Sequence, residues 1–219
     1  MASEVELCKM ALSNIRARSI NSLDEASVEA QTCKLWYPLV RDQMLRESPW
    51  SFTRVIQALA LRTEDPLQWV YAYQYPADCL RLYYVTADFG FKDQSAEGIA
   101  YRDRFDPWFI EPEKAVPFEI QIGSSDRQLV LTDQRDAYAV YTKKVTDPNT
   151  FPVDFYMMLS WYLASQISVP LLGLEGGRAA RSDAMQMYQS LRETAIAANG
   201  NEAKPPRTEQ NDFVTARTT

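Results

Sequence analysis

The sequence predicts an α+β fold: N- and C-terminal helices form a helical bundle, an antiparallel β module is inserted between them, and an extended C-terminal arm follows. Three observations predict it. Apolar residues recur every three or four positions before residue 53 and after residue 147, and they alternate with polar residues in between. After residue 198 large apolar side chains become rare. The predicted segments are 1–53, 54–146, 147–198 and 199–219.

The first helix is predicted to begin after Ser3, because Ser3 and Glu6 have the spacing of a capping box. It is expected to run to about Arg16 or Arg18. Its apolar face recurs at helical spacing and comprises Val5, Cys8, Leu12 and Ile15.

A second, long helix occupies most of residues 27–52 and is expected to start between residues 24 and 28, after a further capping-box spacing at Ser22 and Glu25. Pro38 predicts a kink near Lys34, and Pro49 ends the helix. One predicted buried face comprises Ala30, Cys33, Tyr37, Val40 and Met44, and Trp36, Leu39 and Leu45 are expected to widen it.

Strands are predicted from about residue 54 to residue 146, within a small sandwich or barrel-like module. Four aromatic residues alternate strictly and should project to one face of an extended strand: Trp69, Tyr71, Tyr73 and Tyr75. Further strands are expected at 79–85, 118–122, 128–132 and 137–144, with turns at 123–126 and 133–136.

Helices return after residue 149. Pro152 suits a first helical turn, and Pro170 is expected to end a strongly apolar helix. Glycines at 173, 176 and 177 predict the connection to a last helix over 179–198.

The composition is ordinary for a soluble globular protein, with 46% hydrophobic and 24% charged residues. A net charge of −6 argues against a surface that clamps nucleic acid, although DNA can pass such a surface without sticking. Three widely spaced cysteines predict free thiols in a reducing compartment. Neither a signal peptide nor a membrane span is predicted.

The chain contains no histidine. This excludes Ser-His-Asp and Cys-His nucleophilic sites and the commonest catalytic zinc sites. An enzymatic interpretation must therefore rest on carboxylates, lysine or tyrosine. We predict no catalytic residue, no cofactor and no metal.

Two stretches allow a functional and a structural interpretation. The acidic residues near Trp108 and Phe109 resemble the paired carboxylates and aromatic platform of a glycosidase, or they form a solvated loop or a protein contact; they are Asp103, Asp106, Glu111 and Glu113. The aromatic row beginning at Trp69 could stack on bases or sugars, or it forms the buried or interface face of a strand.

The glycine-rich stretch 173–178 could bind phosphate at a helix N-terminus, but it lacks the lysine of a phosphate loop and favours an interhelical turn. Arg178 and Arg181 are then helix-surface charges or subunit contacts. We predict a protein interface at Asp106, Trp108, Phe109, Arg178 and Arg181.

Several phrases occur in an order that resembles the head-to-tail adaptor family of short-tailed bacteriophages, also called tail tubular protein A. Two of them are Trp-Tyr-Pro-Leu-Val-Arg-Asp at 36–42 and Leu-Arg-Glu-Ser-Pro-Trp-Ser-Phe at 45–52. The others lie at 11–15, 20–23, 73–81, 141–147 and 163–171. The resemblance covers about residues 4–200, and the tail beyond residue 199 matches none of these phrases.

The resemblance implies a structural virion protein at the head–tail interface, assembled in the host cytoplasm. Members of the family form a ring, commonly of twelve copies, that joins the capsid portal to the tail nozzle and lines the channel for DNA ejection. We expect the C-terminal arm to dock on the portal through Arg207, Phe213, Val214 and Arg217. We expect the predicted protein interface, which includes Asp106 and Arg178, to contact the nozzle or a neighbouring subunit. The alternatives are a tail-associated glycan-degrading enzyme and a glycan- or receptor-binding tail component.

Overall fold

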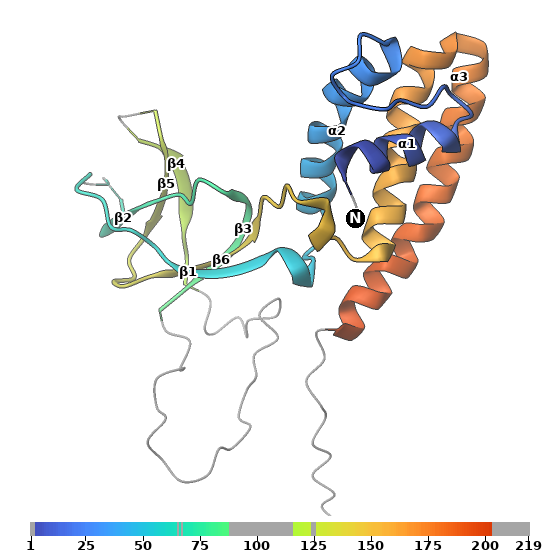
Figure 1. Ribbon diagram of the computed structural model, residues 1–219. Coiled ribbons are helices and arrows are strands. Elements are labelled where there is room, and N and C mark those ends of the chain that lie inside the picture. Colours follow the sequence, from blue (N-terminus) through green and yellow to red (C-terminus); the bar gives the residue numbers. More distant parts are fainter. Residues whose placement is uncertain (1–2, 65, 67, 88–115, 124–125, 203–219) are drawn as a thin grey trace, which may run out of the picture.

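The structure is a computed structural model that describes residues 3–64, 66, 68–87, 116–123 and 126–202. It confirms the α+β fold: along the sequence, helices come at both ends of the described chain and the strands of two antiparallel sheets come between them. In space the sheets lie to one side of the helices (Figure 1). The helices are α1 (Glu4–Asn14), α2 (Val28–Glu47) and α3 (Val153–Glu202), with short 3-10 helices η1 (Ser51–Thr53) and η2 (Pro148–Thr150). The strands are β1 (Arg54–Ala58), β2 (Tyr71–Gln74), β3 (Cys79–Thr86), β4 (Glu119–Ile122), β5 (Gln128–Thr132) and β6 (Tyr138–Lys143).

The start of α1 is as predicted, because the Ser3 hydroxyl accepts the Glu6 N–H at 3.1 Å. The helix ends at Asn14, a little earlier than expected. Arg16 adopts the left-handed conformation with φ 57°, which stops a right-handed helix.

Ser27 caps α2, its hydroxyl accepting the Ala30 N–H at 3.3 Å. This start lies within the predicted interval. The second capping-box pair closes the preceding turn instead, where Glu25 accepts the Ser22 N–H at 3.0 Å. The helix continues through Pro38, whose ring is exposed, and ends as predicted before Pro49.

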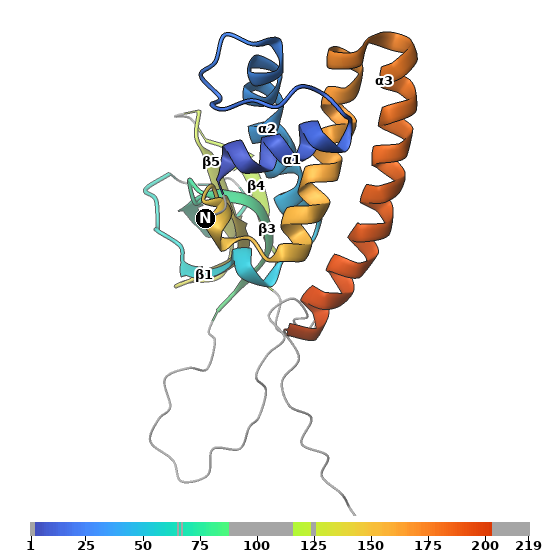
Figure 2. The same ribbon diagram turned by 45° about the vertical axis from the view of Figure 1, so that its right-hand side comes forward.

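The long helix α3 is two antiparallel halves joined at Gly173 (Figure 2). Gly173 has φ 74°, a conformation that favours glycine. A Cβ at Gly177 would lie 2.6 Å from the Val169 Cα, so only glycine lets the halves approach this closely. The glycine-rich stretch therefore forms the interhelical turn. The first half extends past Pro170, and the second reaches Glu202, four residues beyond the predicted end at Ala198.

The three helices share one core. An aromatic cluster lies at its sheet-proximal end, where the Phe155 ring lies 5.1 Å from the rings of Trp50, Phe52 and Phe151. Trp50 is 3% exposed, and its indole N–H donates to the Met44 carbonyl at 2.9 Å. The largest fully buried side chains of this core are Leu7, Leu12, Ile20, Tyr37, Met44, Leu45, Phe155, Met158, Leu159 and Leu163.

The strands form two three-stranded sheets, in the orders β1-β6-β3 and β2-β5-β4. Side chains from both sheets share a second core, so the sheets pack face to face. Its buried members are Leu59, Tyr73, Leu82, Val85, Val130, Ala137, Ala139 and Tyr141. The strand β4 forms as predicted, but its four residues are all exposed.

The aromatic row is divided between the two faces of its sheet. Tyr71, Tyr73 and Tyr75 pack into the core between the sheets, as expected for one face of a strand. The prediction is wrong for Trp69, which packs on the other face against Ala72 and its neighbours on β5. The reason is that β2 begins only at Tyr71, so the alternation of an extended strand does not reach residue 69.

Candidate functional site

An apolar row lies along the outward face of α2. Val28, Leu35 and Leu39 are 64%, 64% and 61% exposed, and we call them the α2 stripe. Their spacing of seven and four residues places them on one side of the helix. Leu39 was expected to widen the buried face, and that prediction is wrong, whereas Leu45 is buried and Trp36 is half-buried.

The burial of α2 is one-sided because α1 and α3 cover only one side of this helix. Its inward residues fill the helical core: Ala30, Cys33, Tyr37, Val40, Arg41, Met44 and Leu45. A helix covered on one side normally presents polar residues to solvent. Three aliphatic side chains in line on the solvent side depart from this pattern.

A groove runs along the side of the α3 hairpin near its turn. We call it the α3 groove; it has a volume of about 680 Å³ and is lined by Val169, Leu174, Arg178, Arg181, Ser182, Met185, Gln186 and Gln189. Arg178 and Arg181 are exposed, and the ion pairs found among the described residues do not include either of them. The predicted interface arginines thus lie together at one groove.

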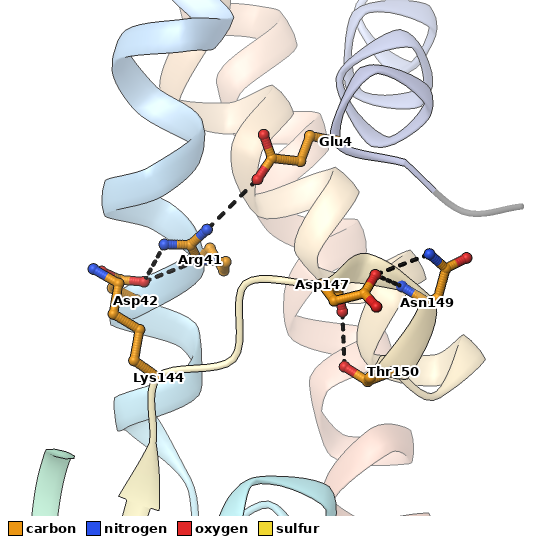
Figure 3. A network of polar contacts seen from close by, with 7 residues as sticks. All are labelled: Glu4, Arg41, Asp42, Lys144, Asp147, Asn149 and Thr150. Atoms are coloured by element: carbon orange, nitrogen blue, oxygen red, sulfur yellow. Dashed lines mark hydrogen bonds and ion pairs between the residues drawn. The ribbon is translucent and has the colours of Figure 1, made fainter. Parts of the chain in front are cut away.

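A charged network connects the helices to the sheets, and Figure 3 shows its members. The Arg41 side chain is 5% exposed and lies between Glu4 of α1, at 3.7 Å, and Asp42, at 2.8 Å. Asp42 also pairs with Lys144, just after β6, at 2.7 Å. We call these four residues the junction. They link α1, α2 and the end of the sheet, and each cation has a carboxylate partner.

The segment that leads from the junction into α3 is held by its own cap. The Asp147 carboxylate accepts the Asn149 backbone N–H at 3.0 Å and the Asn149 side-chain amide at 2.8 Å (Figure 3). These donors hold the pKa of Asp147 below its ordinary value. The carboxylate therefore stays charged at neutral pH and keeps η2 at the start of α3.

The end of α3 is hydrogen-bonded to the segment that follows α2. The Asn199 side chain accepts the Ser51 N–H at 2.7 Å and donates to the Pro49 carbonyl at 3.0 Å. Earlier on α3, the Tyr188 hydroxyl donates to Glu47 at 2.8 Å. Burial together with that carboxylate raises the pKa of the Tyr188 hydroxyl. The helical hairpin and the border with β1 therefore form one unit.

The outer face of the sheet β2-β5-β4 carries a pocket of about 410 Å³. Its apolar floor is formed by Ala72, Leu129 and Leu131, and Trp69 forms part of its wall. The indole N–H donates to Glu119 at 3.0 Å, which fixes the ring. The other lining residues are Glu64, Pro66, Gln68, Gln121, Ile122 and Gly123.

Cys8 and Cys33 are free and buried in the helical core, and Cys79 is free and half-buried. The neighbouring Cys33 thiol and burial raise the pKa of Cys8 well above its usual range. A thiol held protonated is a poor nucleophile, so Cys8 acts as a small core side chain. Among the described residues, no cluster of three or more cysteine or carboxylate side chains is arranged to hold a metal ion.

By length and composition alone, the helix 153–200 is apolar enough to cross a membrane. Its apolar first half supplies Phe155, Met158, Leu159 and Leu163 to the helical core, which accounts for this hydropathy. Other predicted site residues lie outside the described residues: Asp103, Asp106, Trp108, Phe109, Glu111, Glu113, Arg207, Phe213, Val214 and Arg217.

Sequence reasoning missed the α2 stripe and the junction. The stripe has a visible signal, since Val28, Leu35 and Leu39 repeat at helical spacing on the side opposite Cys33 and Tyr37. The junction has none, because Glu4, the pair Arg41 and Asp42, and Lys144 come from three distant parts of the chain. No protein-family model matches the chain, and a search of curated proteins finds no significant match.

Proposed function

We propose that the chain is a structural virion protein: a ring-forming adaptor that joins the capsid portal to the tail nozzle and lines the channel for DNA ejection. The ordered phrases of the sequence suggest this role, and the α2 stripe is the observation that carries it. Full burial of a leucine or valine side chain stabilises by about 1.5–3 kcal/mol. Three such side chains left in solvent favour a state in which another subunit covers them.

In this proposal the helices form the ring wall, because they hold the larger core and the α2 stripe. The sheets project toward the nozzle, and the segment after residue 202 carries the arm that docks on the portal. The net charge of −6 suits a wall that DNA passes without specific binding.

The test is reconstitution of the full chain with the portal protein, followed by negative-stain imaging and native mass measurement. We expect a closed ring, commonly of twelve copies, on the portal. A variant truncated after residue 202 should lose portal binding and still form the ring wall. A chain that stays monomeric and ignores the portal would overturn the proposal.

A second candidate function is glycan binding by a tail component, and the Trp69 pocket is the observation that favours it. An indole wall beside amide groups such as Gln68 and Gln121 suits a sugar ring, which offers an apolar face and hydroxyl groups. Glycan-array binding by the full chain that disappears with Trp69→Ala would support it. Binding that survives this change would exclude the pocket as its site.

A further inference from the structure

We propose that neighbouring copies bind through two different surfaces: the α2 stripe of one copy enters the α3 groove of the next. This inference rests on the proposed ring and names the contact that closes it. It commits to a second copy of this chain as the occupant of the groove.

The α2 stripe has the pattern of a helix that docks into a groove. Its anchors Val28, Leu35 and Leu39 occupy positions i, i+7 and i+11. The intervening i+4 position is the half-buried Thr32. The helix is already ordered by its inward contacts with α1 and α3. Docking would therefore not require folding of the segment, which removes a large entropic penalty.

The α3 groove offers matching chemistry. Val169, Leu174 and Met185 supply apolar contact surface, and the long polar side chains around them can close over a bound helix. Leu174 is itself 64% exposed. The close approach of the two halves at Gly177 brings Val169 of the first half beside the residues of the second half.

The charges near the two surfaces are complementary. Three carboxylates lie at or just before the start of α2. Asp24 pairs with Lys34 at 2.7 Å, Glu25 accepts the Ser22 N–H at 3.0 Å, and Glu29 lies outside the ion pairs of the described residues. Arg178 and Arg181 at the α3 groove are exposed and lie outside the ion pairs of the described residues. The start of α2 and the turn of the α3 hairpin lie at the same end of the bundle in Figures 1 and 2.

The positions of the surfaces explain why such a contact forms a ring. In both views α2 lies on one side of the helical part and the second half of α3 lies on the other. A contact between two different surfaces of one chain leaves a free surface at each end of any short oligomer. Growth then ends only when the rotation between neighbours closes a ring, whereas a stripe-to-stripe contact would end at a dimer.

The test is disulfide trapping between full-length chains. An equimolar mixture of Leu35→Cys and Met185→Cys chains should form a 35–185 cross-linked dimer on mild oxidation, and each variant alone should not. A chain carrying both changes should give a ladder of oligomers that ends in a closed ring. Val153→Cys paired with Met185→Cys is the matched control, because Val153 is 76% exposed and lies outside the α2 stripe.

Charge reversal at the groove provides a second readout. Arg178→Glu with Arg181→Glu should lower the yield of the 35–185 cross-link by about tenfold or more, equivalent to the loss of about 1.4 kcal/mol in contact free energy. A dominant 35–35 cross-link would overturn the proposed pairing of surfaces. Rings on the portal without a 35–185 cross-link would overturn this contact while the proposed function stands. Absence of both rings and cross-links would overturn both.

Discussion

The helices and the sheets differ in how much of their structure is buried. Of the described residues, 23 apolar side chains are buried in the helical core, against eight between the sheets and three on the outer sheet face. Every residue of β4 is exposed, whereas each helix contributes buried residues to one core. The helices therefore supply most of the hydrophobic stability.

The largest expected effect is a cavity in the helical core. Phe155→Ala removes a ring that contacts Trp50, Phe52 and Phe151, and it should lower the free energy of unfolding by about 3–5 kcal/mol. Leu129→Ala, on the outer sheet face, should lower it by only about 2 kcal/mol. Urea denaturation measures both. An equal loss at the two sites would contradict the contrast between the helical core and the outer sheet face.

Removal of Arg41 should weaken the link between the helices and the sheets. Arg41→Ala leaves Asp42 and Glu4 without their buried partner, and we expect a loss of about 2–3 kcal/mol in thermal or urea unfolding. Arg41→Met keeps the volume and should lose less. An Arg41→Met chain as stable as the unchanged protein would mean that charge at the junction contributes nothing beyond packing.

The sheet part should weaken in alkali. Burial raises the pKa of Cys79 to about 11 from its usual 9.0. A raised pKa means that the folded state binds this proton more tightly than the unfolded state, so its contribution is complete below about pH 9 and is lost as the pH rises through about 11. Denaturation at a series of pH values should show this decline. Cys79→Ala should make the decline of stability with pH less steep. An unchanged slope would show that other titrating groups cause the decline.

The smallest effect is expected on the α2 stripe. Leu39→Gln should change the free energy of unfolding of the isolated chain by less than about 0.5 kcal/mol, because Leu39 is 61% exposed. The buried Leu45→Gln is the matched comparison on the same helix and should be strongly destabilising. If Leu39→Gln destabilised the monomer, the stripe would belong to the monomer's own packing.

Local patterns predicted much of the fold. The Ser3 cap, the end of α2 before Pro49 and the glycine-rich turn of α3 all depend on residues near one another in the sequence. Leu39 and Trp69 could not be placed in this way. Which side of a helix is covered, and where a strand begins, depend on segments distant in the chain. Of the predicted interface residues, only Arg178 and Arg181 lie within the described part, and the structure brings both to one groove.

The bonds of Asn199 have a mechanical consequence. Its side chain bonds to Pro49 and Ser51, so the last turn of α3 is fastened at the border between α2 and β1. Tension on the chain beyond α3 would reach this border directly through two hydrogen bonds, without first bending the hairpin at Gly173. A pull on that segment would therefore act first at the border where the sheets join the helices.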